Sequence, residues 1–222
     1  MAIKAVIFDL DGTLLNTIED LADAMNTVLL KRGFSKHSVK NYKSFVGNGI
    51  ENMVKQALPV YFSNNEEIVS ECITLFKSEY ESIWNKKTQP YSGINILLDN
   101  FDAAKIKKCI LSNKPDEFVQ KVIKHYFTKW EFEYVVGAKK GQPLKPDPKV
   151  VNDLIDKMGV SKEECLYIGD TDTDMKTGKN AGVFTIGAAW GFRDEDELTE
   201  AGADYCANIP EDIIEYLLKK TA

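Results

Sequence analysis

Residues 4–13 read K-A-V-I-F-D-L-D-G-T, and this stretch determines the predicted fold. The run Lys4–Phe8 is short, apolar on successive positions and partly β-branched, which is typical of a strand covered on both faces. Asp9 and Asp11 follow it directly, before a turn at Gly12. A buried strand that ends in two carboxylates predicts a parallel sheet with a polar site at its carboxyl edge.

Similar strand-like runs recur along the chain and alternate with segments of helical periodicity. Two of the helical stripes lie at Val119–Tyr126 and Val150–Met158. Strand and helix in alternation predict an α/β fold, a doubly wound parallel sheet of the Rossmann-like kind. The further strands are predicted at Lys108–Ser112, Tyr134–Val136, Cys165–Gly169, Val183–Gly187 and Tyr205–Ala207.

One long stretch breaks this alternation. Residues 17–87 show helical stripes only, with a turn signal at Pro59. We therefore predict two domains, a core made of residues 1–16 and 88–222 and an inserted α-helical cap at 17–87. Such a cap would sit over the carboxyl ends of the strands, where open α/β folds bind ligands.

The composition limits the classes of function. The chain has 222 residues, of which 44% are hydrophobic and 28% charged, as in ordinary globular proteins. A net charge of -6 argues against a nucleic-acid or anionic-membrane surface, and no apolar run reaches the roughly 18 residues of a membrane span. The four cysteines form no C-x-x-C pair, so we expect buried, reduced thiols in a cytoplasmic enzyme. The oligomeric state does not follow from the sequence.

A second acidic cluster follows the strand predicted at Cys165–Gly169. Asp170, Asp172 and Asp174 offer carboxylate oxygens, the ligands that Mg²⁺ or Ca²⁺ prefers. Simpler interpretations stay open at this point. The acids could favour the dipole of a helix N-terminus, and Asp11 or Thr13 could cap the helix after the first strand.

Two further polar pieces follow other predicted strands. Ser112 and Asn113 supply a hydroxyl and an amide before a helix that opens near Pro115, an arrangement suited to binding phosphate. Lys145 places one cation just before another predicted helix. A doubly wound sheet gathers the carboxyl ends of its strands around one crevice, so we expect these pieces to meet.

Together these residues resemble the haloacid dehalogenase superfamily over nearly the whole chain. The D-x-D-G-T motif lies at Asp9–Thr13, the hydroxyl of the second motif is Ser112, the lysine of the third is Lys145, and G-D-x-x-x-D lies at Gly169–Asp174. The helical insert resembles the α-helical cap of the first subclass of the superfamily.

Within that superfamily the chain looks most like the phosphoglycolate phosphatases. The stretches that carry this resemblance are V-G-N-G-I-E at 46–51, S-N-K-P at 112–115 and K-P-D-P at 145–148. The resemblance implies a Mg²⁺-dependent phosphatase that acts on a small phosphorylated metabolite, with 2-phosphoglycolate as the first candidate.

The resemblance also implies a role for each matched residue. Asp9 would be the nucleophile and form an aspartyl-phosphate, and Asp11 would be the general acid and base. Mg²⁺ would be bound by the Asp9 carboxylate, the Asp11 backbone carbonyl and Asp170, with Asp174 acting through water or positioning the ligands. Lys145 would be the third catalytic residue and would offset the charge of the phosphoryl oxygens. Phosphate contacts in the core are implied for Thr13, Ser112, Asn113 and Lys145, and substrate contacts in the cap are implied for Gly47, Asn48 and Gly49.

Other activities use the same core residues. A sugar-phosphate mutase would keep both aspartates of the first motif, and inorganic pyrophosphatase activity is also compatible with them. A protein of a different class, a non-catalytic regulator that binds a phosphorylated ligand, would be expected to have lost one of these acids. The dehalogenases of the superfamily lack an acid at the position of Asp11, which argues against that reaction.

Overall fold

The computed structural model describes residues 2–221 and divides the chain into two compact units. One unit is Asn16–Gln89, and the other combines Met1–Leu15 with Pro90–Ala222. The sequence placed the boundaries of the insert at 17 and 87. Each unit has its own core and is described by itself.

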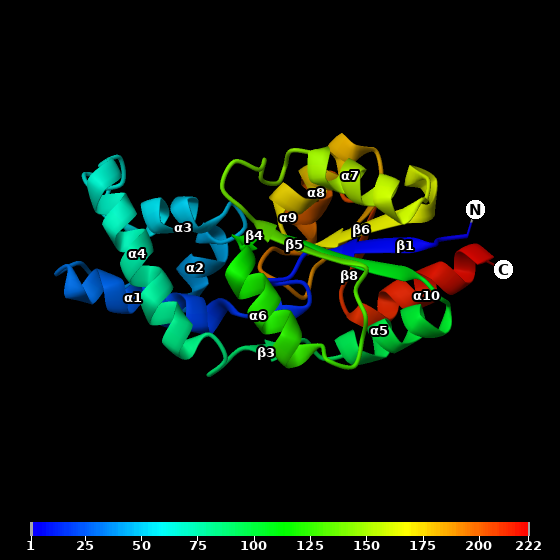
Figure 1. Ribbon diagram of the computed structural model, residues 1–222, viewed down its shortest axis with the longest axis horizontal. Coiled ribbons are helices and arrows are strands. Elements are labelled where there is room, and N and C mark those ends of the chain that lie inside the picture. Colours follow the sequence, from blue (N-terminus) through cyan, green and yellow to red (C-terminus); the bar gives the residue numbers. More distant parts are fainter. Residues whose placement is uncertain (1, 222) are drawn as a thin grey trace. The chain divides into compact units, whose positions relative to one another are not determined.

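Within residues 2–221, six parallel strands form one sheet in the order β5-β4-β1-β6-β7-β8 (Figure 1). The chain winds outward from β1 first in one direction and then in the other, so the predicted doubly wound, Rossmann-like fold is confirmed. The strands are β1 (Ala5–Phe8), β4 (Lys107–Pro115), β5 (Tyr134–Ala138), β6 (Cys165–Gly169), β7 (Phe184–Ala188) and β8 (Tyr205–Ala207).

Helices cover both faces of this sheet, which explains why β1 is apolar at every position. In Figure 1, α5 and α10 lie on one face, and α7 and α8 lie on the other. Ile7 of β1 belongs to a cluster with Leu154 and Ile155, whereas the ring centroid of Phe8 lies 5.9 Å from that of Phe101. The helices are α5 (Ile94–Ala103), α6 (Asp116–Tyr126), α7 (Lys149–Met158), the 3₁₀ turn η1 (Lys162–Glu164), α8 (Asp172–Ala181), α9 (Glu195–Glu200) and α10 (Pro210–Thr221).

Strand β4 runs further than the sequence predicted, to Pro115 rather than Ser112. Its pairing with β5 becomes irregular after Leu111 and resumes at Pro115, opposite Ala138. The intervening residues therefore leave the regular ladder, and their side chains are free to make contacts outside the sheet. One of them, Asn113, is buried and is described with the site below.

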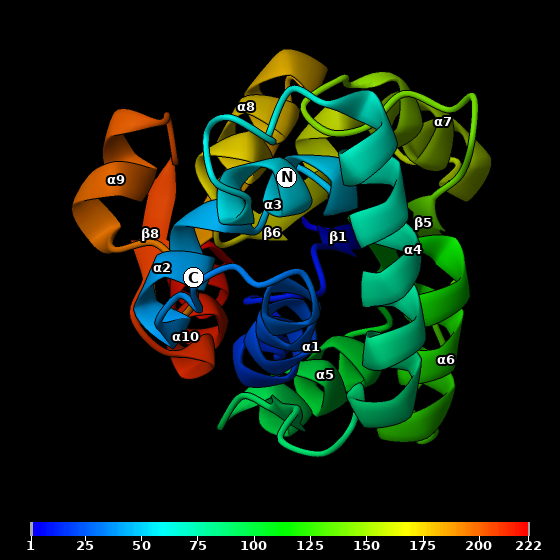
Figure 2. The same ribbon diagram turned by 90° about the vertical axis from the view of Figure 1, so that its left-hand side faces the viewer.

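The other unit is helical, and Figure 2 looks onto its helices. Helix α1 packs against α4, in which Val69, Cys72, Phe76 and Tyr80 are buried. The helices are α1 (Ile18–Lys31), α2 (Val39–Phe45), α3 (Ile50–Ala57) and α4 (Glu66–Ile83), and short strands β2 (Leu15–Asn16) and β3 (Gln89–Pro90) pair where the units join.

The cap of the first helix and the state of the cysteines are both defined by the structure. Helix α1 begins at Ile18 with Thr17 at its N-cap position, so neither Asp11 nor Thr13 caps it, and that alternative was wrong. All four cysteines are free thiols. Among residues 2–221, no helix combines the length and the apolar character needed to cross a bilayer.

A buried carboxylate in α1 binds the C-terminal end of the helical unit. Asp20 in α1 is 1% exposed and accepts hydrogen bonds from the backbone N–H groups of Lys87 and Thr88 and from the Thr88 hydroxyl, at 2.8–3.1 Å. These bonds tie the start of α1 to the segment that leads back to the sheet. Removing the carboxylate would leave two buried Thr88 donors without this acceptor.

We therefore expect Asp20→Ala to cost about 2–3 kcal/mol, which corresponds to a fall of roughly 5–10 °C in Tm. Thermal unfolding followed by circular dichroism measures it. Asp23→Ala is the matched control, because Asp23 is on the same helix and pairs with Lys87 at the surface. Equal effects of the two substitutions would contradict a structural role specific to Asp20.

Candidate active site

The candidate site lies where the winding of the sheet reverses. Asp9 follows β1, and Asp170 follows the adjacent strand β6, whose residue Ile168 is level with Phe8. The Asp9 N–H donates to the Ile168 carbonyl at 2.9 Å, which extends the pairing by one residue. Parallel pairing therefore brings the two acids to the same edge of the sheet, at the position where such folds bind ligands.

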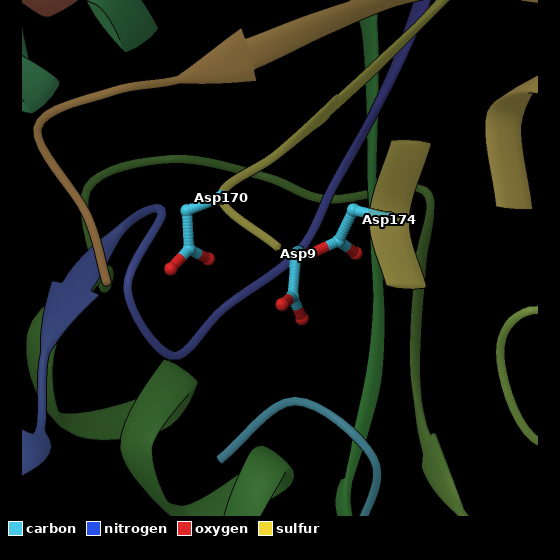
Figure 3. A group of neighbouring side chains, drawn as sticks. All are labelled: Asp9, Asp170 and Asp174. Carbon is cyan, nitrogen blue, oxygen red and sulfur yellow. The ribbon is translucent and has the colours of Figure 1, made fainter. Parts of the chain in front are cut away.

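Three acids meet at this edge (Figure 3). Carboxylate oxygens of Asp9, Asp170 and Asp174 all lie within 4.8 Å of one another, and all three residues are buried. In Figure 3, Asp9 lies between Asp170 on the segment after β6 and Asp174 on α8. The structure thus brings together the three carboxylates that the sequence predicted for a metal site. The remaining acid of the stretch after β6, Asp172, lies outside the cluster and pairs with Lys176.

Asp170 is held in place by neighbours that approach it very closely. Its Oδ1 accepts from the Thr13 hydroxyl at 2.9 Å, and its Oδ2 accepts from the Phe192 N–H at 3.0 Å. A Cβ on Gly12 would lie 2.0 Å from Oδ2, and one on Gly191 would lie 2.4 Å from the Cβ of Asp170. Gly12 also has a φ of +90°, so both space and backbone conformation require glycine there.

Asp174 is surrounded by hydrogen-bond donors of the protein. Its Oδ1 accepts from the Tyr167 hydroxyl at 3.0 Å and from Lys145 Nζ at 2.7 Å. Its Oδ2 accepts from the N–H and the hydroxyl of Thr171 at 3.1 and 2.6 Å, because Asp174 closes a capping box at the start of α8. Asp174 is therefore fixed rigidly and in turn orients Lys145.

Lys145 is the buried cation of the cluster. Its Nζ lies 2.7 Å from Asp174 and 2.9 Å from Asp9 Oδ1, and its side chain is 2% exposed. Burial alone would lower its pKa, but Asp174 and Asp9 outweigh that effect and hold the pKa above its usual value. Lys145 is therefore a permanent ammonium group beside the proposed nucleophile.

Asp9 carries a carboxylate that the protein compensates only in part. Burial, and then the charge of Asp174, raise its pKa from 3.8 to about 7, against the opposing effect of Lys145. Its Oδ1 is buried and accepts no hydrogen bond, because the contact with Lys145 is an ion pair without hydrogen-bond geometry. Burial together with the neighbouring acids also raises the pKa of Asp170 well above its usual value.

These observations fit a bound divalent cation. Three buried carboxylates face one ammonium group, which leaves an excess of negative charge, and one carboxylate oxygen has no hydrogen bond. Oxygen donors of this kind suit a hard cation such as Mg²⁺. Asp9 and Asp170 are the residues that could hold it, because each Asp170 oxygen accepts one hydrogen bond from the protein, whereas each Asp174 oxygen accepts two.

Asp11 lies at the site but outside the acidic cluster. Its two carboxylate oxygens accept from Lys114 Nζ at 3.0 and 3.1 Å, and both side chains are largely buried, at 11% and 3% exposed. The sequence motifs predicted no role for Lys114. Its position in the S-N-K-P stretch, two residues after Ser112, was the signal that could have identified it.

The predicted phosphate-binding residues are also buried here, and some make contacts that the sequence did not foresee. The Asn113 amide donates to the Lys145 carbonyl at 3.1 Å and accepts from the Lys145 N–H at 2.9 Å, so it joins the end of β4 to the loop that carries Lys145. Ser112 Oγ accepts from the Lys114 N–H at 3.3 Å. Thr13 donates its hydroxyl to Asp170, and its predicted contact with phosphate stays a prediction.

The predicted cap residues belong to the helical unit. Gly47, Asn48 and Gly49 connect α2 to α3, and Gly49 occupies the N-cap position of α3 with a φ of +85°. Their contact with substrate stays a prediction.

Comparison with known proteins identifies the family. The model of the haloacid dehalogenase-like hydrolases matches residues 6–188, which include the two acids after β1, Ser112, the two buried lysines of the site, Asp170 and Asp174. The chain belongs to this family. The superfamily resemblance found in the motifs is thereby confirmed.

Individual family members extend the match to the whole chain. A phosphoglycolate phosphatase of Psychrobacter arcticus is 30% identical over 97% of this chain and 96% of its own. One of Vibrio cholerae is 29% identical over 98% of both chains. A solved structure from Lactobacillus delbrueckii subsp. bulgaricus, provisionally assigned as a phosphoglycolate phosphatase, has a TM-score of 0.90 and 29% identity and covers 98% of this chain and 99% of its own.

The raised pKa of Asp9 predicts how stability depends on pH. The folded chain binds the Asp9 proton more tightly than the unfolded chain does, so the cost of ionising Asp9 grows as the pH rises from about 4 to about 7. In EDTA we therefore expect Asp9→Asn to raise Tm by several degrees at pH 8 and to change it little at pH 4.5. Thermal unfolding at both pH values measures this.

Asp172→Asn provides the control. Lys176 lowers the pKa of Asp172 in spite of partial burial, so its ionised form stabilises the fold and its loss should give no gain in Tm at pH 8. An equal Tm change for Asp9→Asn at pH 4.5 and pH 8 would show that ionisation of Asp9 does not destabilise the fold.

Proposed function

We propose that the chain is a Mg²⁺-dependent phosphatase that hydrolyses a small phosphomonoester through an aspartyl-phosphate on Asp9, with 2-phosphoglycolate as the first candidate substrate. The observation that carries the proposal is the Asp9 carboxylate, buried beside Lys145 with one oxygen that accepts no hydrogen bond. Membership of a hydrolase family and relatives named phosphoglycolate phosphatase support the predicted phosphoric monoester hydrolase.

In this reaction Asp9 attacks phosphorus, and the leaving alcohol departs from the opposite side. Asp11 protonates that alcohol and later removes a proton from the water that hydrolyses the aspartyl-phosphate. Lys145 and Ser112 bind the phosphoryl oxygens. The two acids are held by separate lysines, Asp9 by Lys145 and Asp11 by Lys114, which suits two separate roles.

Mg²⁺ is proposed at the cluster, with the Asp9 and Asp170 carboxylates and the Asp11 carbonyl as its protein ligands. When bound, the ion offsets the negative charge that otherwise keeps a carboxylate and a phosphate apart. Asp174 contributes by orienting Lys145 and through the charge it adds to the cluster. A small phosphorylated metabolite as partner, and the cytoplasm as location, stay predictions.

The same residues would serve a sugar-phosphate mutase or a pyrophosphatase. Relatives named as phosphoglycolate phosphatases over nearly their whole length favour the phosphatase over both. A non-catalytic regulator is disfavoured because the nucleophile, the acid and the metal-binding acids are all in place at the site.

The first test is phosphate release in Mg²⁺ from 2-phosphoglycolate, pyrophosphate, several sugar phosphates and nucleoside monophosphates. We expect one substrate to exceed the others clearly, with activity lost in EDTA and in Asp9→Asn. Asp172→Asn, an acid of the same stretch that pairs with Lys176 outside the cluster, should keep its activity. Absence of turnover by folded, Mg²⁺-supplied wild type would overturn the phosphatase.

A second prediction concerns the phosphoryl oxygens. Ser112→Ala removes one preorganised donor, so kcat should fall roughly 10²–10³-fold. Weaker inhibition by inorganic phosphate should accompany that fall, because the product makes the same contact. Steady-state kinetics measures both quantities. Unchanged kcat and unchanged phosphate inhibition would remove Ser112 from the site.

A further inference from the structure

The site contains two buried lysines, and the proposed reaction uses only one of them. Lys145 lies on Asp9 and Asp174, at the nucleophile. Lys114 lies on Asp11, with its Nζ 3.0 and 3.1 Å from the two carboxylate oxygens. Its side chain is 3% exposed, so its ammonium group is shielded from water beside Asp11.

Burying an ammonium group is costly, and a buried ion pair often does not repay that cost. A family member that needed only a correctly placed acid could orient Asp11 with a neutral donor. The choice of a lysine therefore indicates that positive charge is required at this place. The required charge points to an anion that arrives with the substrate.

The position of Lys114 shows which part of the substrate that anion belongs to. As general acid, Asp11 must come within about 2.6–3.2 Å of the leaving oxygen. Lys114 Nζ, one hydrogen bond further on, then lies within roughly 6 Å of that oxygen. A carboxylate on the neighbouring carbon extends about 3 Å from the leaving oxygen toward the ammonium group, which closes the distance to a hydrogen bond.

We propose that Lys114 is a specificity-determining residue that binds an anionic substituent on the leaving alcohol, so that the enzyme selects phosphorylated hydroxy acids over neutral phosphomonoesters. This inference rests on the proposed phosphatase function and names the substrate class of that same site. The substrate carboxylate shares Lys114 with Asp11, while Lys145 and Ser112 hold the phosphoryl group. The two buried lysines thus bind the two anionic groups of one small substrate.

The test compares two substrates that differ in one charge, 2-phosphoglycolate and its neutral amide, 2-phosphoglycolamide. We expect wild type to prefer the acid in kcat/KM, and Lys114→Met to reduce that preference roughly 10- to 100-fold, the range for a lost charged hydrogen bond. Lys114→Arg, which keeps the charge, should retain most of the preference. Lys129→Met, which removes an exposed lysine paired with Asp99, is the charge control and should leave it unchanged.

The outcomes separate this inference from the proposed function. Equal kcat/KM values for the two substrates in wild type, or a preference that survives in Lys114→Met, would overturn the role of Lys114 while leaving the phosphatase in place. Equal losses on both substrates would mean that Lys114 only positions Asp11. Hydrolysis of neither substrate by wild type would count against the phosphatase itself. If Lys114→Met does not fold, Lys114→Gln, which keeps a donor without the charge, decides the same question.

Discussion

The ammonium group of Lys145 among buried carboxylates is the interaction on which the rest of the site depends. Without it, Asp9 and Asp174 would be neighbouring negative charges shielded from water, and breaking such a buried pair typically costs about 3–5 kcal/mol. Its position is fixed at both ends, by the Asn113 amide on its backbone and by Asp174 on its Nζ. Segments that follow three different strands are thereby tied into one arrangement, and the remaining charge excess favours a cation.

Much of this arrangement follows from the sequence because parallel strands bring their carboxyl ends to one edge. An apolar run followed by Asp9 and another followed by Asp170 are sufficient to predict that the two acids are neighbours, and the pairing of Phe8 with Ile168 bears this out. The bounds of five of the six strands were predicted to within two residues for the same reason, since a strand buried on both faces is apolar at every position.

The contacts that the sequence did not predict depend on distances rather than on pattern. The extension of β4 to Pro115 results from pairing that resumes after an irregular stretch, which no periodicity announces. The hydrogen bond from Thr13 to Asp170 forms where the backbone at Gly12 and Gly191 passes very close to that aspartate. A Cβ on either glycine would clash with Asp170. The pairing of Lys114 with Asp11 depends on the same irregular stretch of β4. The sequence therefore predicted no role for this lysine.

The distribution of these residues between the two units bears on how specificity is built. Asp9, Asp11, Asp170, Lys145 and Lys114 all belong to the unit that contains the sheet. Lys114 cannot change without altering what holds Asp11. Selection for an anionic leaving group is therefore coupled to the acid that performs the chemistry.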